Sequence, residues 1–418
     1  MTNSHSPGQV ELLAPAGNFE KLETAIYYGA DAVYLAGKDF SLRNYAANFS
    51  FEEMEKGIAL AHAHHVKVYV ACNIYSRNHE QEAISRYLET LGDIGPDALI
   101  IADPGILFLA KQIVPELDIH LSTQANTTNA SCARFWEAQG VKRINVAREL
   151  SIEEINGIAR NSSIEIEAFV HGAMCISMSG RCLLSSYMID RDGNRGLCAQ
   201  PCRWRYAVVE EKRPGEYLPI VEDERGAYIF NSRDLCMIEH LPAMIESGIS
   251  SLKIEGRMKS INYLASAVKV YREAIDRYHT EGKAYRVRKE WTEELSRISN
   301  RQYCTGFYLG DPKQITPNYP DDKPATIHRF IGKIIESHGK GMATVQVRNK
   351  MICGDNVEIL TPRGPAIKDT ILEILDKNLQ PSSVAQPNQI VTIRFSHNYS
   401  PNDLIRKLEE ISYKASGR

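Results

Sequence analysis

Five of the nine cysteines of this 418-residue chain lie within one short window, where their thiols could bind a metal ion or a cluster. They are Cys175, Cys182, Cys198, Cys202 and Cys236, and their spacing is C-x6-C-x15-C-x3-C followed by x33 to the last. No neighbouring pair has the C-x2-C spacing that most structural zinc sites use. Glycines and serines surround the cysteines and would let backbone N–H groups approach cluster sulfurs. The pattern therefore favours an iron–sulfur cluster over zinc, with buried reduced thiols as a third alternative.

Arginines are concentrated in the same window, with aromatic residues between them. The set comprises Arg181, Arg191, Arg195, Arg203 and Arg205, interleaved with Trp204 and Tyr206. Guanidinium groups beside aromatic rings suit an anionic or planar substrate such as a nucleotide, although a solvated surface is the alternative. The formal net charge of the chain is -3, so any contact with RNA has to come from a local patch of this kind.

The elements that must position these residues alternate between β-rich runs and amphipathic helical stretches. Strands are expected at Val10–Ala16, Asp31–Gly37, Lys67–Asn73, Asp97–Asp103, Asp118–Gln124, Arg143–Arg148, Ile164–Gly172 and Ser251–Arg257. Two of the intervening helices begin with capping signals, one at Asn18 and one at Ser50 with Glu53. Such alternation implies parallel strands joined by right-handed crossovers. We therefore predict an α/β fold with a TIM-like (β/α)8 barrel, and a doubly wound open sheet is the alternative.

Side-chain alternation places polar residues on the interior face of several predicted strands. Lys253, Glu255 and Arg257 alternate with apolar residues in the eighth strand, and His171 lies near the end of the seventh. Barrel enzymes keep their chemistry at the C-terminal ends of their strands. We therefore take these four as candidate catalytic residues, with Lys253 and Arg257 binding a small dicarboxylate and His171 or Glu255 moving protons. A structural polar network is the alternative.

The distribution of these elements predicts two domains. Roughly 80 residues separate the seventh and eighth strands, far more than a βα connection needs, and this insertion contains the five cysteines. From Ala325 the sequence changes to short alternating strands with glycine-containing turns, and a polar tail is expected from Pro401. The predicted domains are a barrel over residues 1–324, with the cysteine-bearing insertion at about 173–250, and a small C-terminal β-barrel over residues 325–418.

The sequence contains no segment typical of a membrane helix or of an export signal. No apolar run approaches the roughly 18 residues that a membrane span needs, and the first residues lack an apolar h-region. The expected location is therefore the cytoplasm, where reducing conditions make disulfides rare.

Several motifs occur in an order that identifies a family. They are His171-Gly-Ala-Met-Cys175, Ser179-Gly-Arg-Cys182, Gly193-Asn-Arg-Gly-Leu-Cys198-Ala-Gln-Pro-Cys202-Arg, Ser232-Arg-Asp-Leu-Cys236 and Leu252-Lys-Ile-Glu-Gly-Arg257, with Glu11-Leu-Leu-Ala-Pro-Ala-Gly17 near the start. Together with the C-terminal β-domain they resemble the U32 peptidase family, first described as collagenase-like proteases. The resemblance covers nearly the whole chain.

The domain layout looks most like the tRNA hydroxylation branch of that family. This resemblance implies a hydroxylase that forms 5-hydroxyuridine at the wobble position of tRNA, with prephenate as co-substrate. It also implies a [4Fe–4S] cluster on Cys175, Cys182 and Cys198, with Cys236 preferred over Cys202 as the fourth ligand. The implied partners are tRNA, prephenate and a related U32 subunit, since some relatives work as heterodimers.

Two other functions stay open from the sequence. A U32-type peptidase would fit the family name, but the chain has neither a His-Glu-x-x-His helix nor a Gly-x-Ser-x-Gly elbow. The only pair suggestive of a cysteine protease is His171 with Cys175, and a cluster on Cys175 would remove that role. A non-enzymatic iron–sulfur maturation or partner protein is the second alternative.

Overall fold

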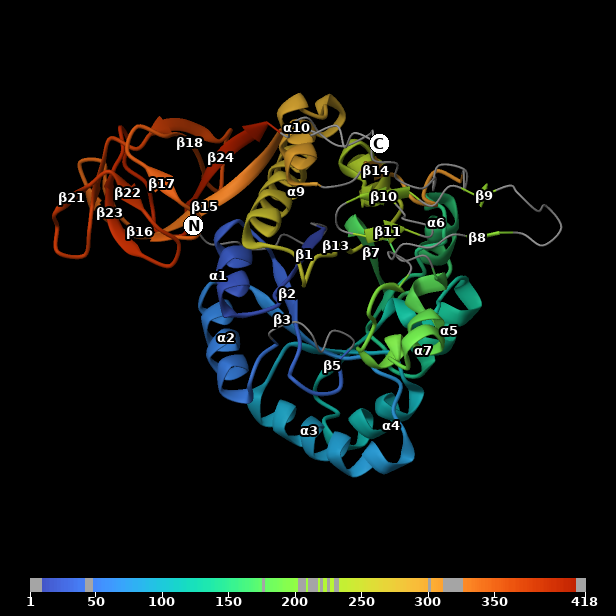
Figure 1. The fold of residues 1–418 in the computed structure, drawn as a ribbon. Coiled ribbons are helices and arrows are strands. Elements are labelled where there is room, and N and C mark those ends of the chain that lie inside the picture. Colours follow the sequence, from blue (N-terminus) through green and yellow to red (C-terminus); the bar gives the residue numbers. More distant parts are fainter. Residues whose placement is uncertain are drawn as a thin grey trace.

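A computed structural model describes residues 10–41, 48–174, 177–201, 208–209, 217–218, 221–223, 226–228, 233–299, 302–310 and 326–410. Its larger part is a closed barrel of parallel strands ringed by helices (Figure 1). The barrel strands are β1 (Glu11–Pro15), β2 (Ala32–Leu35), β3 (Lys67–Cys72), β4 (Ala98–Ile101), β5 (Asp118–Leu121), β6 (Arg143–Asn145), β7 (Glu165–Ala173) and β13 (Ser251–Ile254). Strand β13 pairs with both β1 and β7 and so closes the ring. The predicted (β/α)8 barrel is confirmed, and the open sheet is excluded.

Helices surround the barrel, and two of them begin at the capping signals found in the sequence. They are α1 (Phe19–Tyr27), α2 (Phe51–Ala63), α3 (Gln81–Ile94), α4 (Pro104–Ile113), α5 (Ala130–Ala138), α6 (Ile152–Arg160), α8 (Leu241–Glu246) and α9 (Ile261–Glu281), followed by α10 (Lys289–Ile298). The Asn18 side chain accepts a hydrogen bond from the Lys21 N–H, and Ser50 and Glu53 form a reciprocal capping box. The apolar faces of these helices pack with outward-facing strand residues into one core.

The inside of the barrel combines a small apolar cluster with a buried ionic network. At its N-terminal end Glu11 accepts hydrogen bonds from Arg143 (2.6 Å), Tyr69 (2.6 Å) and Ser251 (2.8 Å). Burial alone would raise the pKa of Glu11, but Arg143 and the hydroxyl donors together bring it below its usual value. Glu11 is therefore held ionised, and the network fastens β1 to β3, β6 and β13.

A long segment connects β7 to β13, and its described part contacts loops of the barrel. Its described elements are η3 (Met178–Gly180), α7 (Leu184–Ile189), η4 (Gly193–Arg195), β8 (Val208–Val209), β9 (Tyr217–Leu218), β10 (Val221–Asp223), β11 (Gly226–Tyr228), β12 (Asp234–Cys236), η6 (Ile238–His240) and α8. Strand β12 runs antiparallel to the end of β7, and β14 (Tyr303–Cys304) pairs parallel with β12. The shorter turns η1 (Asn78–Glu80), η2 (Thr123–Ala125) and η7 (Gly282–Ala284) lie in other loops.

The C-terminal domain is an antiparallel half-barrel built mainly from one sheet. Its strands are β15 (Thr326–Gly339), β16 (Met342–Val347), β17 (Met351–Ile352), β18 (Asn356–Leu360), β19 (Ile367–Thr370), β20 (Glu373–Leu375), β21 (Pro381–Ser382), β22 (Val384–Ala385), β23 (Ile390–Arg394) and β24 (Leu404–Glu410). The polar tail predicted from Pro401 is wrong, because β24 pairs between β15 and β18. Leu404 and Ile405 are buried there, and the charged residues that follow them hide the strand in the sequence.

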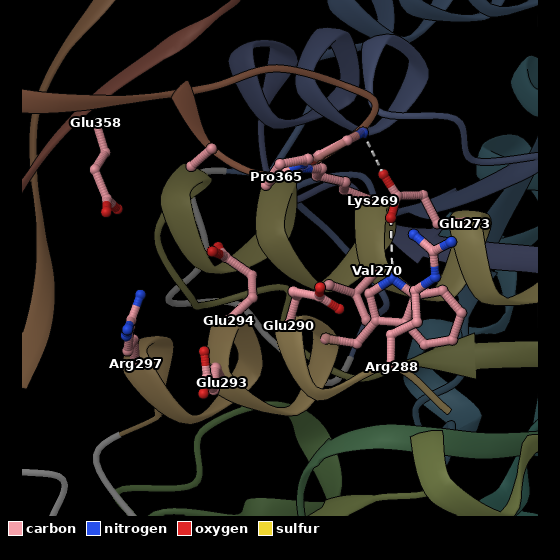
Figure 2. Close-up of a pocket in the computed structure, with 13 residues that line it drawn as sticks. Lys269, Val270, Glu273, Arg288, Glu290, Glu293, Glu294, Arg297, Glu358 and Pro365 are labelled. Carbon is pink, nitrogen blue, oxygen red and sulfur yellow. Dashed lines mark hydrogen bonds between the residues drawn. The ribbon is translucent and has the colours of Figure 1, made fainter. Parts of the chain in front are cut away.

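The two domains meet along α1, α9 and α10 (Figure 1). Arg406 of β24 is fully buried and pairs with Glu294 of α10, while the Ser266 hydroxyl of α9 lies 3.1 Å from its guanidinium. Figure 2 shows the adjoining interdomain pocket, where Glu273 accepts hydrogen bonds from the Gly364 N–H and the Trp291 indole. Burial would raise the pKa of Glu294, but Arg406 lowers it to about 2. The half-barrel is therefore fixed to the barrel by buried, charge-assisted contacts.

Among the described residues, no helix is both long and apolar enough to span a bilayer.

Candidate functional site

Two of the predicted cluster ligands, Cys182 and Cys198, are held by the same turn. The Cys182 N–H donates to the Asn194 side-chain oxygen, and the Asn194 amide donates back to the Cys182 carbonyl, both at 3.0 Å. A methyl group on Gly193 would lie 3.6 Å from the Cys198 Sγ and 3.8 Å from the Cys182 carbonyl oxygen. The Gly193–Asn194 turn thus brings the two cysteines together across 15 intervening residues.

Backbone N–H groups point at both of these sulfurs. The Leu184 N–H donates to the Cys182 Sγ and the Gln200 N–H donates to the Cys198 Sγ, each at 3.4 Å. Donors of this kind stabilise thiolates and are among the contacts by which proteins tune cluster sulfurs. Each of the two sulfurs therefore accepts a hydrogen bond from a backbone N–H.

Cys236 belongs to another element and lies at the end of β12, opposite His171 of β7. Its Sγ is 3.9 Å from the Tyr271 hydroxyl oxygen of α9. Burial raises the pKa of the Cys236 thiol to about 11, against the lowering effect of the Ile238 N–H and the Tyr271 hydroxyl. Strand β12 nevertheless runs beside the end of β7, the strand that leads directly to Cys175.

The described part of the chain contains no group of three metal-binding side chains. Two of the predicted cysteines, Cys175 and Cys202, fall outside the described residues. The structure therefore brings together Cys182 and Cys198 and leaves the choice of the fourth ligand as a prediction.

The loops that carry these cysteines are fastened to the C-terminal ends of the barrel strands. Ser179 contacts the Glu149 carboxylate through its N–H (2.6 Å) and hydroxyl (2.7 Å). Arg181 donates to the Gln124 carbonyl oxygen at 2.6 Å, and its guanidinium carbon lies 5.2 Å from the centre of the Tyr75 ring. The cysteine turn therefore rests on the loops after β3, β5 and β6.

Arg195 adds a further attachment. Its guanidinium donates to the Tyr75 carbonyl oxygen at 2.6 Å and pairs with Glu80, whose pKa it lowers. Two of the arginines predicted to face an anionic substrate thus also hold the cysteine loops on the barrel. The sequence did not identify the partners of these loops, because they lie in loops far away along the chain. They are Glu80, Glu149 and the carbonyl oxygens of Tyr75 and Gln124.

Lys253 points into the barrel, as the alternation predicted. Its side chain is only 6% exposed, and the Nζ lies 2.7 Å from the Glu167 carboxylate. The same Nζ lies 4.5 Å from the centre of the Tyr34 ring and 5.5 Å from that of Phe169. Nothing in the sequence indicated that Lys253 would pair with Glu167, which lies 86 residues earlier in the chain.

Glu255 and Arg257 continue from Lys253 toward the mouth of the barrel. A Glu255 carboxylate oxygen lies 3.4 Å from the Tyr34 hydroxyl, which also donates to the Ile254 carbonyl at 3.0 Å. The Arg257 guanidinium lies 3.4 Å from the Ser41 hydroxyl, and the Arg257 carbonyl accepts from the Lys21 ammonium at 2.9 Å. Lys253, Glu255 and Arg257 thus lie on one continuous stretch of chain at the end of β13.

His171 lies in a different environment from Lys253. The β7–β13 register shifts after Lys253, so that Phe169 opposes Lys253 while His171 opposes the core residue Ile254. This bulge turns His171 away from the face predicted by strict alternation. Its ring is fully buried, with ring centroids 5.6 Å from Tyr263, 5.6 Å from Tyr271 and 5.2 Å from Tyr303.

The burial of His171 also determines its charge. Loss of solvation lowers the pKa of the imidazole to about 3, so the ring is neutral near physiological pH. A neutral, enclosed imidazole suits packing of β7 against α9 better than the proton transfer predicted from the sequence.

Comparison with known families agrees with the order of the motifs. The model of peptidase family U32 matches residues 17–318, and that of the U32 C-terminal domain matches residues 327–406. The chain belongs to peptidase family U32. The resemblance inferred from the cysteine and Lys-Ile-Glu-Gly-Arg motifs is therefore confirmed.

Several U32 relatives are named for RNA hydroxylation. The chain is 40% identical to tRNA hydroxylation protein P1 of Bacillus subtilis over 95% of this chain and 94% of the relative. It is 39% identical to tRNA hydroxylation protein P of Escherichia coli, over 85% of this chain and 86% of that protein. A 23S rRNA 5-hydroxycytidine synthase of Escherichia coli is 31% identical over 86% of this chain and 53% of that protein.

Proposed function

We propose that this U32 protein is a tRNA-modifying enzyme that hydroxylates the wobble uridine to 5-hydroxyuridine, with prephenate as co-substrate. The support is the similarity, over most of both chains, to relatives named tRNA hydroxylation proteins. The observation that carries the proposal is that the cysteine turn and the Lys253–Arg257 stretch lie at the same end of the barrel. The cysteine turn is fastened to loops at the C-terminal ends of β3, β5 and β6, and the Lys253–Arg257 stretch follows β13 at the same end.

In this proposal Cys175, Cys182, Cys198 and Cys236 hold a [4Fe–4S] cluster, with Cys202 as the alternative fourth ligand. The fit rests on the described thiols: Cys182 and Cys198 share one turn, and each accepts a backbone N–H. A bound cluster would supply one-electron redox chemistry, which protein side chains lack. The chain contributes the thiolate ligands, the N–H donors and the loops that keep the cysteines at the barrel mouth.

Lys253 and Arg257 are proposed to bind the carboxylates of prephenate. Both are cations at the end of β13, and their charged groups are held in place, the Lys253 ammonium by Glu167 and the Arg257 guanidinium by contact with Ser41. Arginine and lysine donate charge-assisted hydrogen bonds to carboxylates, which would orient the small substrate. Glu255 lies between them and is the candidate for accepting or returning a proton.

Nucleoside mass spectrometry of bulk tRNA tests this proposal in cells. A strain that lacks the protein and any related hydroxylase should lose hydroxylated wobble uridine and its derivatives. The wild-type gene should restore them and the Cys198→Ser gene should not, while Cys353→Ser, in the C-terminal domain, should restore them fully. Unchanged tRNA nucleosides in the deletion strain would exclude the tRNA substrate. An altered rRNA nucleoside in that strain would indicate ribosomal RNA instead.

A further inference from the structure

The Tyr271 hydroxyl lies where three polar groups of β7 and β12 converge. It donates to the Val170 carbonyl oxygen at 2.7 Å, accepts from the Met237 N–H at 3.1 Å and lies 3.9 Å from the Cys236 Sγ. Tyr271, Val170 and Met237 are fully buried, and Cys236 is half-buried. Water therefore does not compete for the contacts of the Tyr271 hydroxyl with Val170 and Met237, and the protein alone sets their geometry.

The number of hydrogens available between the Tyr271 oxygen and the Cys236 sulfur depends on whether the Cys236 thiol is protonated. A hydroxyl has one hydrogen, and Tyr271 gives it to Val170, so a protonated Cys236 can donate its S–H to the tyrosine oxygen. A cysteine that ligates iron has lost its hydrogen and can only accept. Between the Tyr271 oxygen and the Cys236 sulfur, only the Tyr271 O–H can then donate a hydrogen bond.

The structure allows the tyrosine hydrogen to turn toward the sulfur at little cost. The Val170 carbonyl also accepts the Met237 N–H at 2.9 Å, so it keeps a hydrogen bond when Tyr271 withdraws. No buried acceptor is left unsatisfied by the change, which is the usual penalty for moving a buried hydrogen bond. The Met237 N–H is shared between Val170 and Tyr271 and remains bonded in either arrangement.

We infer that Tyr271 is a positioning residue that donates a hydrogen bond to the cluster ligand Cys236 and thereby raises the cluster's reduction potential. The inference rests on the proposed cluster and on Cys236 as its fourth ligand. A hydrogen bond to a ligand sulfur disperses negative charge and so favours the reduced, more negative cluster. Tyr271 also joins the helix α9 to this ligand, which links the cluster site to the long helix that faces the C-terminal domain.

The test is a redox titration of the full-length protein after anaerobic reconstitution with iron and sulfide. Tyr271→Phe removes the donor and keeps the ring, so we expect wild-type iron and sulfide content with a lower midpoint potential and an altered EPR signal. Tyr278→Phe is the matched control, because it lies on the same helix and its hydroxyl bonds to exposed Glu246. That control should leave the potential unchanged.

A second substitution tests the opposite direction. Site-specific 3-fluorotyrosine at position 271 keeps the hydroxyl and makes it a stronger donor, so the midpoint potential should rise. This arm also serves if Tyr271→Phe does not fold, because the fluorinated ring is nearly isosteric with tyrosine.

The outcomes separate the inference from the function on which it rests. A loaded Tyr271→Phe protein with the wild-type potential, or a fluorotyrosine protein without a rise, would overturn the role of Tyr271 alone. Full cluster content in Cys236→Ser would overturn the ligand assignment and this inference with it. A wild-type chain that binds no cluster under the same conditions would contradict the proposed cofactor itself.

Discussion

At the residue scale, the site depends on charges whose partners are distant in the sequence. The residue types and the alternation of the eighth strand predicted that Lys253 would point inward, and it does. The same alternation did not predict the orientation of His171, because a bulge in the β7–β13 pairing shifts the register there. A bulge arises from the pairing of two strands and leaves no periodic signal in either one. Pairings such as Lys253 with Glu167 are likewise set by the closure of the barrel.

Arg257→Ala tests the proposed anion site. Loss of a charge-assisted bond to a carboxylate should raise KM for prephenate by about tenfold to a hundredfold. Affinity for tRNA should change much less, since the guanidinium lies against Ser41 at the end of the barrel strands. Steady-state kinetics and a tRNA filter-binding assay measure the two effects, with Arg329→Ala, an exposed arginine of the C-terminal domain, as control. Equal losses of prephenate use and tRNA binding would contradict this role.

At the element scale, glycine at one position allows β7 and β13 to close the barrel beside the site. Gly172 has a φ of +111°, and a Cβ there would lie 2.4 Å from the Glu255 carbonyl oxygen. The motif His171-Gly172 therefore places a residue without a side chain where Glu255 must pass. The sequence predicted both strands, but the close approach became apparent only from their register. Strand β24 was not predicted, because its buried residue Arg406 interrupts the apolar alternation that marks a strand.

Gly172→Ala should destabilise the barrel and disturb the Glu255 backbone. The backbone conformation alone should cost about 1–3 kcal/mol, and the overlap with Glu255 adds to it. Gly157→Ala is the matched control, because nothing lies within 4 Å of its Cβ position on α6. That substitution should be neutral or stabilising by about 0.5–1 kcal/mol. Equilibrium denaturation compares the two, and equal stabilities would show that the Gly172 contact is unimportant.

At the scale of the whole molecule, the half-barrel is fixed to the barrel by charges buried between them. Arg406 and Glu294 are 112 residues apart in the chain, so their pairing was not apparent from the sequence. The sequence did indicate that a second, β-rich domain follows the barrel. It could not indicate that α9 and α10 form the surface on which this domain docks, because both helices read as ordinary amphipathic segments.

Removing one partner of this buried pair should destabilise the interface strongly. Arg406→Met leaves the Glu294 carboxylate buried without its main counter-charge, at a cost of about 3–5 kcal/mol. The double variant Arg406→Met with Glu294→Leu should recover part of that loss, because it removes one of the two carboxylates that face Arg406 and leaves Glu358 with His328 as its partner. Urea denaturation of the two variants measures the difference. A double variant no more stable than Arg406→Met would indicate that the charge itself is not the cause.

Asp403 makes the stability of the interface fall as the pH rises. Burial raises its pKa to about 6, although the Ser400 N–H, the Tyr27 hydroxyl and Lys269 lower it. The folded protein therefore holds this proton more tightly than the unfolded chain, and ionisation costs stability as the pH rises from about 4 to about 6. Asp403→Asn cannot ionise, so its stability relative to wild type should grow over that range by about 3 kcal/mol. Melting temperatures from pH 4 to pH 8 measure this, and a constant difference would contradict the raised pKa.

The central claim is that the isolated chain, loaded with its cluster, hydroxylates tRNA. The most direct measurement is mass spectrometry of nucleosides from unmodified tRNA after anaerobic incubation with the reconstituted protein and prephenate, which is then the oxidant that takes up the two electrons released when uridine is hydroxylated. We predict that one uridine, at the wobble position, gains a single oxygen, and that omission of prephenate or the Cys198→Ser substitution abolishes the product. Fully loaded protein that leaves the tRNA unchanged with prephenate present would contradict the claim and favour a maturation or partner role.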